Sequence, residues 1–316
     1  MAVDGGPNPS NIDIADIDHD LDTWHEITKL AGQVDRESVE WLLAYLAHED
    51  PAARWQACVA LAQTAAHLRK RARGGPVHPG GTSSQFAFTE LLTRMHQNLR
   101  APSPVLRAAT ADAFAFWDHE AVVSFLGQSL TDPEPLVRVS VVTALGRIGD
   151  VATVDWLAAS LLDSSMWVRR AAADALGEMG ARQAVGALDE ALGDDQSLVR
   201  AAVVAALGHI RSAKARQILE RCTQDADPEI RWYAARSLGQ IGDRASCAAL
   251  ADLRREGGHV LFGQTTAQVA NEAISAIEKR DRGIVNRIRR VLYTLARFVR
   301  HARRPQSRGN GSPTAQ

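Results

Sequence analysis

The stretch DPEPLVRVSVVTALGRIG, residues 132–149, decides the fold because it recurs along the chain. It returns as DSSMWVRRAAADALGEMG at 163–180, as DDQSLVRAAVVAALGHIR at 194–211 and as DADPEIRWYAARSLGQIG at 225–242. The arginines at the seventh position of these copies are 31 residues apart: Arg138, Arg169, Arg200 and Arg231. A constant period of this size is typical of a solenoid, in which each unit packs on its neighbours.

Each copy also has an internal helical pattern. Two weaker copies precede the four, around Arg54 and Arg107. Apolar residues recur 12 residues before all six arginines, and 15 and 8 residues before the first five, which is the spacing of one face of a helix. After the arginine, alanine, leucine and glycine recur at positions +6, +7 and +8, as in Ala144, Leu145 and Gly146. Each unit is therefore predicted to hold a first helix, a turn and a closely packed second helix.

The composition agrees with stacked helices and excludes several classes of protein. Hydrophobic residues make up 46 % of the 316, aromatic residues only 5 %, and the net charge of −1 provides no global attraction to polyanions. The three cysteines, Cys58, Cys222 and Cys247, lack metal-ligand spacing and are predicted to be reduced core thiols. Without a secretory h-region or a membrane-spanning apolar run, the chain is predicted to be cytoplasmic, with peripheral membrane contact as an option.

At these residues the chain resembles the HEAT repeat, specifically the short bacterial form first named from phycobilisome lyases. The resemblance covers about residues 35–280. It implies an all-α, right-handed solenoid of about six to seven antiparallel helix pairs, with the second helices on the concave side. It also implies that the arginines and the preceding aspartates bridge adjacent turns. We assign to this structural ladder Asp132, Arg138, Asp163, Arg169, Asp194, Arg200, Asp227 and Arg231.

The flanks and interruptions define the domain organisation. We expect an acidic flexible leader at 1–21, a capping helix at 22–34, the solenoid at 35–280, a basic amphipathic helix at 281–304 and a disordered tail at 305–316. Arg54 and Arg107 are 53 residues apart, 22 more than the period, and the surplus predicts an insertion loop at about 69–86. The next arginine after Arg231 would fall at Phe262, so the array is predicted to degrade into a cap there.

Two stretches are strongly basic. Residues 279–308 carry eleven Lys or Arg and one acid, and apolar residues recur within them at steps of three and four. Such a basic amphipathic helix suits a final cap, a membrane-surface helix or a docking helix for an acidic partner. We favour the cap, with contact to an anionic surface as a secondary role. The candidates for that contact, from both stretches, are Arg69, Lys70, Arg71, Arg73, Arg287, Arg290, Arg297 and Arg300.

Catalytic or metal chemistry finds little support in the sequence. His–Glu pairs occur at His25–Glu26, His48–Glu49 and His119–Glu120 and invite comparison with deoxyhypusine hydroxylase, a HEAT-like di-iron enzyme built on such pairs. In that enzyme the pairs follow the anchoring position of symmetric repeats, whereas here they are scattered and are not expected to converge on a metal. We therefore predict no metal, no cofactor and no catalytic residues.

The second helices offer better candidates for binding. Positions +1, +5 and +9 after each arginine share one exposed face, and their formal charges are three positive and three negative. A groove that tracks phosphates would carry one sign, so this face disfavours duplex nucleic acid. Aromatic residues and arginines amid mixed charge are typical of protein-binding surfaces, although packing between repeats is an equal alternative for the two tryptophans. The predicted partner-binding residues are Trp55, Phe116, Arg147, Arg170, His209, Trp232, Tyr233 and Arg236.

We therefore predict an interaction scaffold that binds a partner protein on its concave face and catalyses nothing itself. One alternative is a phycobilin lyase-type HEAT subunit that acts on a tetrapyrrole-carrying protein. A weaker alternative is a nucleic-acid-binding HEAT-like protein. Repeat resemblance alone does not separate these functions, because a fold does not carry a function.

Overall fold

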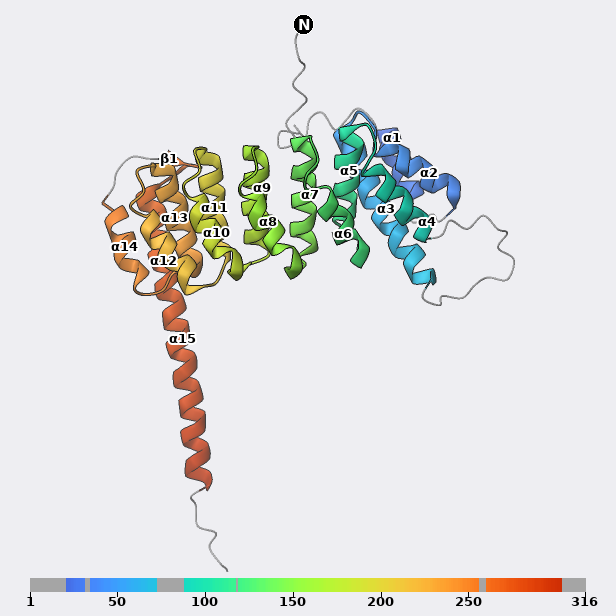
Figure 1. The fold of residues 1–316 in the computed structure, drawn as a ribbon. Coiled ribbons are helices and arrows are strands. Elements are labelled where there is room, and N and C mark those ends of the chain that lie inside the picture. Colours follow the sequence, from blue (N-terminus) through green and yellow to red (C-terminus); the bar gives the residue numbers. More distant parts are fainter. Residues whose placement is uncertain (1–20, 32–34, 73–87, 118, 256–259, 303–316) are drawn as a thin grey trace, which may run out of the picture. The chain divides into compact units, whose positions relative to one another are not determined.

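The computed structural model describes residues 21–31, 35–72, 88–117, 119–255 and 260–302. They form antiparallel pairs of α-helices, and each pair corresponds to one predicted unit (Figure 1). The chain divides into two compact units, the first ending at Ile218 and the second beginning at Leu219. Each unit is described by itself.

Seven helix pairs occur within the described residues, which confirms the predicted all-α solenoid of about six to seven pairs. The first helices are α2 (Arg36–Tyr45), α4 (Phe88–Asn98), α6 (Glu120–Gln128), α8 (Val154–Ser160), α10 (Val185–Ala191), α12 (Ala213–Cys222) and α14 (Ser246–Leu253). The second helices are α3 (Pro51–Ala72), α5 (Pro104–Phe114), α7 (Pro135–Ile148), α9 (Met166–Glu178), α11 (Ser197–His209), α13 (Pro228–Ile241) and α15 (Thr266–Ala302). Helix α1 (Leu21–Leu30) precedes them and packs on α2 and α3.

Proline and glycine set the ends of the second helices. Helices α7 and α13 begin at Pro135 and Pro228, where a missing backbone N–H costs no hydrogen bond. The carboxylate of Asp227 accepts the N–H of Glu229 and so caps α13. Helix α7 ends at Gly149, whose φ of 70° lies in the left-handed region that glycine adopts without strain.

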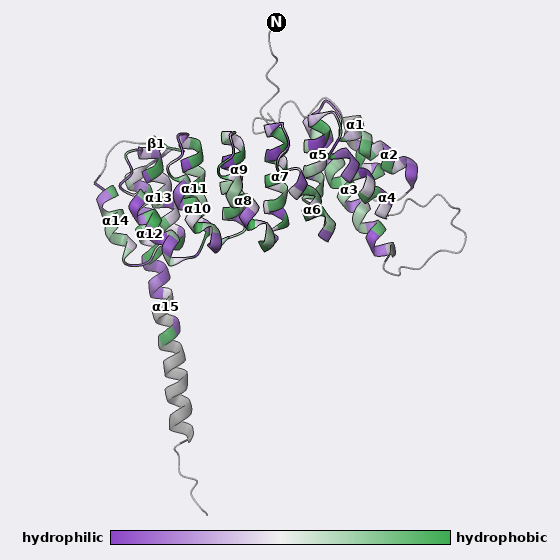
Figure 2. Cartoon of the chain, in the orientation of Figure 1, coloured by the Kyte–Doolittle hydropathy of each residue, from purple (hydrophilic) through white to green (hydrophobic). Residues whose placement is uncertain are grey.

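The repeating apolar positions form the core. All six residues 12 positions before the arginines are fully buried, and so are all six residues at position +7. They are Leu42, Met95, Leu126, Leu157, Leu188 and Leu219 in the first helices, and Leu61, Phe114, Leu145, Leu176, Leu207 and Leu238 in the second. Figure 2 shows hydrophobic and hydrophilic residues side by side along these helices, as amphipathic helices require.

The glycine at +8 lets neighbouring second helices approach closely. A Cβ added at Gly146 of α7 would lie 2.5 Å from the Cβ of Ala175 on α9. A Cβ added at Gly177 of α9 would lie 2.7 Å from the Cα of Ala206 on α11. No side chain fits at these distances, so these two contacts require a glycine at +8 facing a small residue at +6 of the next repeat. The contact justifies a residue that is otherwise unfavourable inside a helix.

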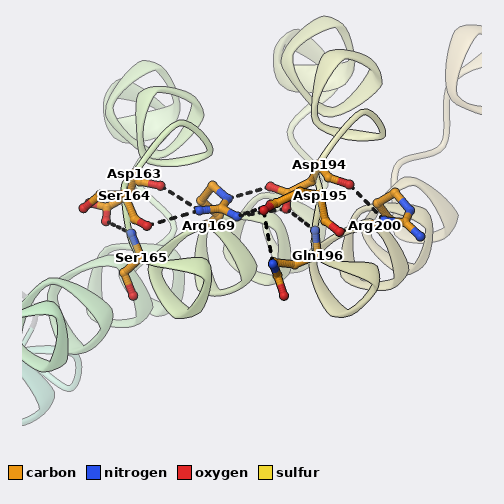
Figure 3. Close-up of polar contacts among 8 residues, drawn as sticks. All are labelled: Asp163, Ser164, Ser165, Arg169, Asp194, Asp195, Gln196 and Arg200. Atoms are coloured by element: carbon orange, nitrogen blue, oxygen red, sulfur yellow. Dashed lines mark hydrogen bonds and ion pairs between the residues drawn. The ribbon is translucent and has the colours of Figure 1, made fainter.

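The ladder arginines join each turn to the next (Figure 3). Arg169 donates from Nε to Asp194 Oδ2 at 2.5 Å and from Nη2 to Asp194 Oδ1 at 2.9 Å. Its Nη1 donates backwards to the carbonyl oxygen of Asp163 at 3.0 Å, and Asp194 also accepts the N–H of Gln196 at 2.9 Å. One guanidinium thus fastens two consecutive turns. The hydrogen bonds from Arg169 hold the pKa of Asp194 below its ordinary value.

The same bridge recurs twice earlier in the first unit. Arg107 forms two hydrogen bonds to Asp132, at 2.7 and 2.8 Å, and Arg138 forms two to Asp163, at 2.8 and 2.7 Å. Burial alone would raise the pKa of each aspartate, but the arginine and backbone hydrogen bonds outweigh it and lower the pKa. These pairs are mostly buried, bidentate bridges rather than loose surface ion pairs.

The later arginines have the same backbone contacts. Arg200 donates to the carbonyl oxygen of Asp194 at 2.9 Å, and Arg231 donates to that of Asp225 at 2.7 Å. Asp225 lies six residues before Arg231, as Asp163 lies before Arg169, and its side chain accepts the N–H of Asp227 at 2.8 Å. Asp227, which we assigned to the ladder from the sequence, caps α13, and this role is separate from the ladder.

The last repeat is longer than the sequence pattern predicted. A Cβ at Gly239 of α13 would lie 3.2 Å from the Cα of Ala273 on α15, the same glycine-to-alanine contact as in the earlier repeats. This places the arginine position at Ala267, five residues beyond Phe262. The intervening residues include a hairpin of β1 (Val260–Leu261) and β2 (Gln264–Thr265). The array therefore continues into α15 instead of degrading at Phe262.

Three predicted boundaries differ from the helix ends. Helix α3 continues to Ala72, so the insertion predicted from residue 69 begins as helix, and its part at 73–87 lies outside the described residues. The boundary predicted at 280/281 falls inside α15. Helix α1 spans 21–30, so it begins at the last residue of the predicted leader and continues into the predicted capping segment, with Ile27 buried. The leader up to residue 20 and the tail lie outside the described residues.

Candidate functional site

Three predicted partner-binding residues meet on the second helices of the first unit. Trp55 lies on α3, Phe116 lies just after the end of α5, and Arg147 lies in the last turn of α7. The side chains of Trp55 and Phe116 are 46 % and 42 % exposed, which is high for large aromatic residues. Arg147 is also exposed. We call these three residues the Trp55 cluster.

The Trp55 cluster is held together by its aromatic rings and one cation. The rings of Trp55 and Phe116 pack edge to face, with centroids 5.5 Å apart and an interplanar angle of 73°. The Cζ atom of Arg147 lies 5.5 Å from the centroid of Trp55 and 5.7 Å from that of Phe116. Within the described residues, Arg147 forms no salt bridge. Its guanidinium is thus positioned by the rings and keeps donors for a ligand.

A carboxylate lies beside the Trp55 cluster. Burial raises the pKa of Asp112 to about 6, although a hydrogen bond from Ser140 and the positive charges of Arg147 and Arg54 oppose the rise. Asp112 is consequently ionised at neutral pH and becomes protonated under mildly acidic conditions. Perturbed ionisable groups of this kind gather at functional sites.

The neighbouring thiol has no catalytic character. Burial, together with the negative charge of Asp112, raises the pKa of Cys58 to about 12. Its Sγ donates a hydrogen bond to the carbonyl oxygen of Ala109 at 3.3 Å. A buried thiol that stays protonated is a poor nucleophile, so Cys58 is a core residue.

The face continues along α9 and α11 with mixed charges. Arg170 Nε lies 3.8 Å from Asp174 Oδ2 on α9, and both side chains are about half exposed. Glu178 and His209 are exposed on the same two helices. Arg170 and His209, both predicted for partner binding, thus share the first unit with the Trp55 cluster. We call the outward positions +1, +5 and +9 of α3, α5, α7, α9 and α11 the second-helix face.

The prediction for Trp232 was wrong, because its side chain is fully buried. The lengthened last repeat supplies the cover. Trp232 Nε1 donates to the carbonyl oxygen of Gln264 at 3.3 Å, and the ring of Phe262 lies 5.7 Å away. Trp232 is therefore a core residue of the second unit and presents no surface to a partner.

The two residues predicted alongside Trp232 remain partly accessible. The ring of Tyr233 lies 5.2 Å from that of Trp232, and the Cζ atom of Arg236 lies 5.6 Å from the same ring. Tyr233 is half-buried and Arg236 is exposed. These two residues belong to the second unit and are not part of the Trp55 cluster.

The predicted anionic-surface residues lie on two helices. On α3, Lys70 is exposed and Arg69 is half-buried, and Arg71 lies in the last turn of the helix. Arg73 lies outside the described residues. On α15, Arg287 is exposed, and the backbone positions of the other predicted arginines follow it along the helix: Arg290, Arg297 and Arg300.

A second apolar row escaped the sequence interpretation. Leu136, Trp167 and Leu198 lie at the starts of α7, α9 and α11, and are 47 %, 49 % and 45 % exposed. Each lies two residues before its ladder arginine, so the 31-residue period itself was the signal that could have revealed them. Their register places them at the turns, apart from the second-helix face.

Among the described residues, no three His, Cys, Asp or Glu side chains are arranged to hold a metal ion. His48 Nδ1 accepts the N–H of Asp50 at 3.1 Å, and His119 Nδ1 accepts that of Ala121 at 3.2 Å, so both have backbone roles. None of the described helices has the length and hydrophobicity needed to cross a bilayer.

A pocket of about 340 Å³ lies in the first unit beside the bridge between Arg107 and Asp132. The rings of His96 and Phe125 stack in its wall at a centroid distance of 3.8 Å. Because its charged pair is the ladder bridge itself, we assign this pocket to the structure and not to the second-helix face.

The chain is similar to several solved structures. In solved structures, the chain resembles the Escherichia coli protein YibA, with 15 % identity, coverage of 81 % of this chain and 97 % of YibA, and a TM-score of 0.52. Human deoxyhypusine hydroxylase is 21 % identical over 77 % of this chain and 96 % of its own, with a TM-score of 0.35. The CpcE–CpcF complex of phycocyanin lyase from Nostoc sp. PCC7120 is 18 % identical over 76 % and 94 %, with a TM-score of 0.39.

The likeness to YibA shows the fold alone, and the other two are too distant in structure to support an argument. No curated protein matches the sequence. A family model described as HEAT repeats matches residues 92–173, 160–227 and 199–261, which together span more than half of the chain. With the helix pairs, the arginine–aspartate ladder and this match, the chain belongs to the HEAT-repeat family.

Proposed function

We propose that this HEAT-repeat protein is a scaffold that binds a partner protein through the second-helix face of its first unit. The observation that carries the proposal is the Trp55 cluster, in which two large, half-exposed aromatic side chains are fixed by an arginine with spare donors. Tryptophan, tyrosine and arginine dominate the binding energy of protein interfaces.

The cluster is prepared for binding before a partner arrives. Trp55 and Phe116 restrain each other by their edge-to-face contact, and Arg147 is held over both rings. Side chains that are already ordered lose less conformational entropy on association. Preorganisation of this kind supports a role as the centre of an interface.

The charges suggest the chemistry of the partner. Arg147 keeps planar donors that fit a carboxylate, and the two rings offer apolar area beside it. We expect the partner to present an aromatic or aliphatic side chain next to an Asp or Glu. The half-buried carboxylate of Asp112 lowers the net positive charge at the site.

Matched variants test the proposal. A partner captured from the native host by the full-length protein is purified, and its Kd is measured by calorimetry. Trp55→Ala and Arg147→Ala should each weaken binding at least about tenfold, or 1.4 kcal/mol. The controls are Trp167→Ala, whose ring is similarly exposed at 49 %, and Arg182→Ala, also exposed; both should bind within about twofold of wild type. Equal losses in test and control variants would move the interface elsewhere.

The two alternatives from the sequence keep their own tests. A lyase-type subunit would change the absorbance of a bilin when the two are produced together with an acceptor protein. A nucleic-acid binder would retain DNA in a salt-dependent way. The Arg170–Asp174 pair on the second-helix face, which sets opposite charges side by side, speaks against a phosphate track.

A further inference from the structure

Helix α15 consists of a docked part and a protruding part. From Thr266 to Arg280 it packs against α13 and α14, with Ala270, Ala273 and Ile277 buried. The last described hydrogen bonds from α15 to the rest of the repeat come from Arg280, whose Nη2 donates to the carbonyl oxygen of Gly239 at 2.8 Å and whose Nη1 donates to that of Gln240. This part completes the last repeat as its second helix.

Beyond Arg280 the same helix leaves the repeat. Figure 1 shows α15 running on past α13 and α14. A Cβ added at Gly283 would meet no atom within 4 Å, and Arg287 is exposed. The side chain of Ile288 is 53 % exposed, although isoleucine normally lies in a core. No described residue covers this apolar side chain.

The sequence makes the protruding part a basic amphipathic helix. Its apolar positions recur at helical steps through Ile284, Ile288, Val291, Leu292, Leu295, Phe298 and Val299. Arg287 and Arg289 flank Ile288, so a helix places them about 100° to either side of it. No Asp or Glu follows Asp281 within the helix. Arg282 pairs with Glu278 one turn earlier, whereas the arginines from Arg287 onward have no acidic residue within four positions along the chain.

We propose that residues 281–302 bind the surface of an anionic lipid bilayer. The apolar stripe lies among the upper acyl chains, and the flanking arginines contact the anionic headgroups. The helix lies along the surface and does not cross it, in agreement with the absence of a spanning helix among the described residues. At 1.5 Å per residue the bound segment is about 33 Å long.

Charge distinguishes a bilayer from a second copy of the chain. Two such helices packed stripe to stripe would bring the flanking arginines of both copies together, with only Asp281 available to compensate. Like charges along a helix–helix seam are destabilising. An anionic surface instead satisfies the arginines on both borders of the stripe. Because the docked part anchors the helix at Gly239 and Gln240, the protruding part can bind lipid without opening the repeat.

The test uses the full-length protein and sedimentation with vesicles. Vesicles of phosphatidylcholine alone are compared with vesicles that contain about 30 % phosphatidylserine, at low and at high salt. Ile288→Asp should lower the partition coefficient at least about tenfold, whereas Leu162→Asp, at an 83 % exposed site in the first unit, should leave it unchanged. Arg287→Glu should also weaken binding, whereas Arg255→Glu, at a similarly solvent-exposed arginine, should not.

Each outcome decides the proposal. Wild-type binding to the anionic vesicles alone, reduced by salt and lost in Ile288→Asp, supports it. Binding to neither vesicle type, or equally to both, overturns it, and so does full binding by Ile288→Asp. Sedimentation velocity tests whether the stripe instead binds a second copy of the chain. A dimer that dissociates in Ile288→Asp, together with no vesicle binding, would overturn the proposal and assign the stripe to a dimer interface. Trp55→Ala should leave vesicle binding intact, so failure here is distinguishable from failure of the proposed partner interface.

Discussion

Removing the guanidinium of Arg169 tests the ladder most sharply. In Arg169→Ala, Asp194 loses two hydrogen bonds, of 2.5 and 2.9 Å, and the carbonyl oxygen of Asp163 loses one of 3.0 Å. The side chain of Asp194 is only 7 % exposed, so water replaces the lost partner poorly. The hydrogen bond from the N–H of Gln196 is then the main remaining support of the carboxylate.

The magnitude follows from this burial. Breaking a buried ion pair by removing one partner typically costs 3–5 kcal/mol, and an exposed pair contributes less than about 1 kcal/mol. The side chain of Arg169 is 14 % exposed, so the pair resembles a buried ion pair more than an exposed one, although it lies at a surface turn. We expect Arg169→Ala to lower the free energy of unfolding by about 3 kcal/mol. Arg169→Lys should recover little of the loss, because an ammonium cannot make the bidentate contact.

The assay is a double-mutant cycle with Asp194→Ala, read by urea unfolding and by hydrogen exchange. Because a solenoid has nearest-neighbour stability, exchange should rise in the two repeats that the bridge joins and less elsewhere. The coupling energy between the two positions should exceed about 1 kcal/mol. Additive losses, with a coupling below about 0.5 kcal/mol, would refute the bridge as a source of stability.

Acid should remove the same contribution. The pKa of Asp194 is lowered in the folded protein, so the bridge stabilises fully above the unfolded pKa of about 3.9 and fades as the pH falls through the lower, folded value. The difference in stability between wild type and Arg169→Ala should therefore be full at pH 7 and shrink below about pH 4. A difference that stays constant on acidification would contradict the assigned partner.

Four further predictions concern packing, charge and the last helix. Trp232→Ala should cost about 3–5 kcal/mol, because the side chain is fully buried. Gly177→Ala should destabilise by about 1–3 kcal/mol, because the new Cβ would lie 2.7 Å from a backbone atom of the next second helix. Burial raises the pKa of Asp112 to about 6, so its ionisation reduces stability as the pH rises from about 4 to 6, and Asp112→Asn should gain about 2 kcal/mol at pH 7. Deleting residues 283–316 should leave the melting temperature unchanged, because the docked part of α15 ends at Arg280.

Matched controls accompany these variants. Trp41→Ala, at a 54 % exposed site, should change stability by less than about 0.5 kcal/mol. Gly186→Ala, whose new Cβ would meet only the end of a lysine side chain at 3.8 Å, should be neutral or stabilising. The gain from Asp112→Asn should vanish below about pH 4, and its persistence there would rule out the ionisation as the cause. An earlier melting transition after the deletion would show that the protruding helix also acts as a cap.

Much of the fold was predictable because the residue types that recur in the sequence are the ones that pack between helices. Leucine at 12 before and 7 after the arginines, replaced only by Met95 and Phe114 around Arg107, marks positions that are fully buried, and glycine at +8 marks a helix contact too close for a side chain. The lengthened last repeat was not predictable in the same way. Its five extra residues moved the register, and periodicity alone does not say whether an array ends or restarts.

Periodicity also could not predict which residues of the candidate site are exposed. Trp55 and Trp232 hold the same position after their arginines, and the sequence treats them alike. Trp55 stays exposed and meets Phe116 and Arg147, whereas the hairpin of the last repeat covers Trp232. The difference depends on a non-repeating insertion, which a positional pattern cannot evaluate. The sequence placed a boundary at 280/281, where the composition becomes basic, but it did not reveal that one continuous helix, α15, runs through that boundary.

Site-specific photocrosslinking in the native host tests the proposed interface most directly. A photoreactive phenylalanine analogue replaces Phe116, 42 % exposed in the Trp55 cluster, or, as a control, Leu162, 83 % exposed outside it. We predict a discrete covalent adduct with one partner protein from position 116, absent from position 162 and lost when Arg147→Ala is added. An adduct of equal yield from both positions, or none from position 116, would contradict a partner interface centred on the Trp55 cluster.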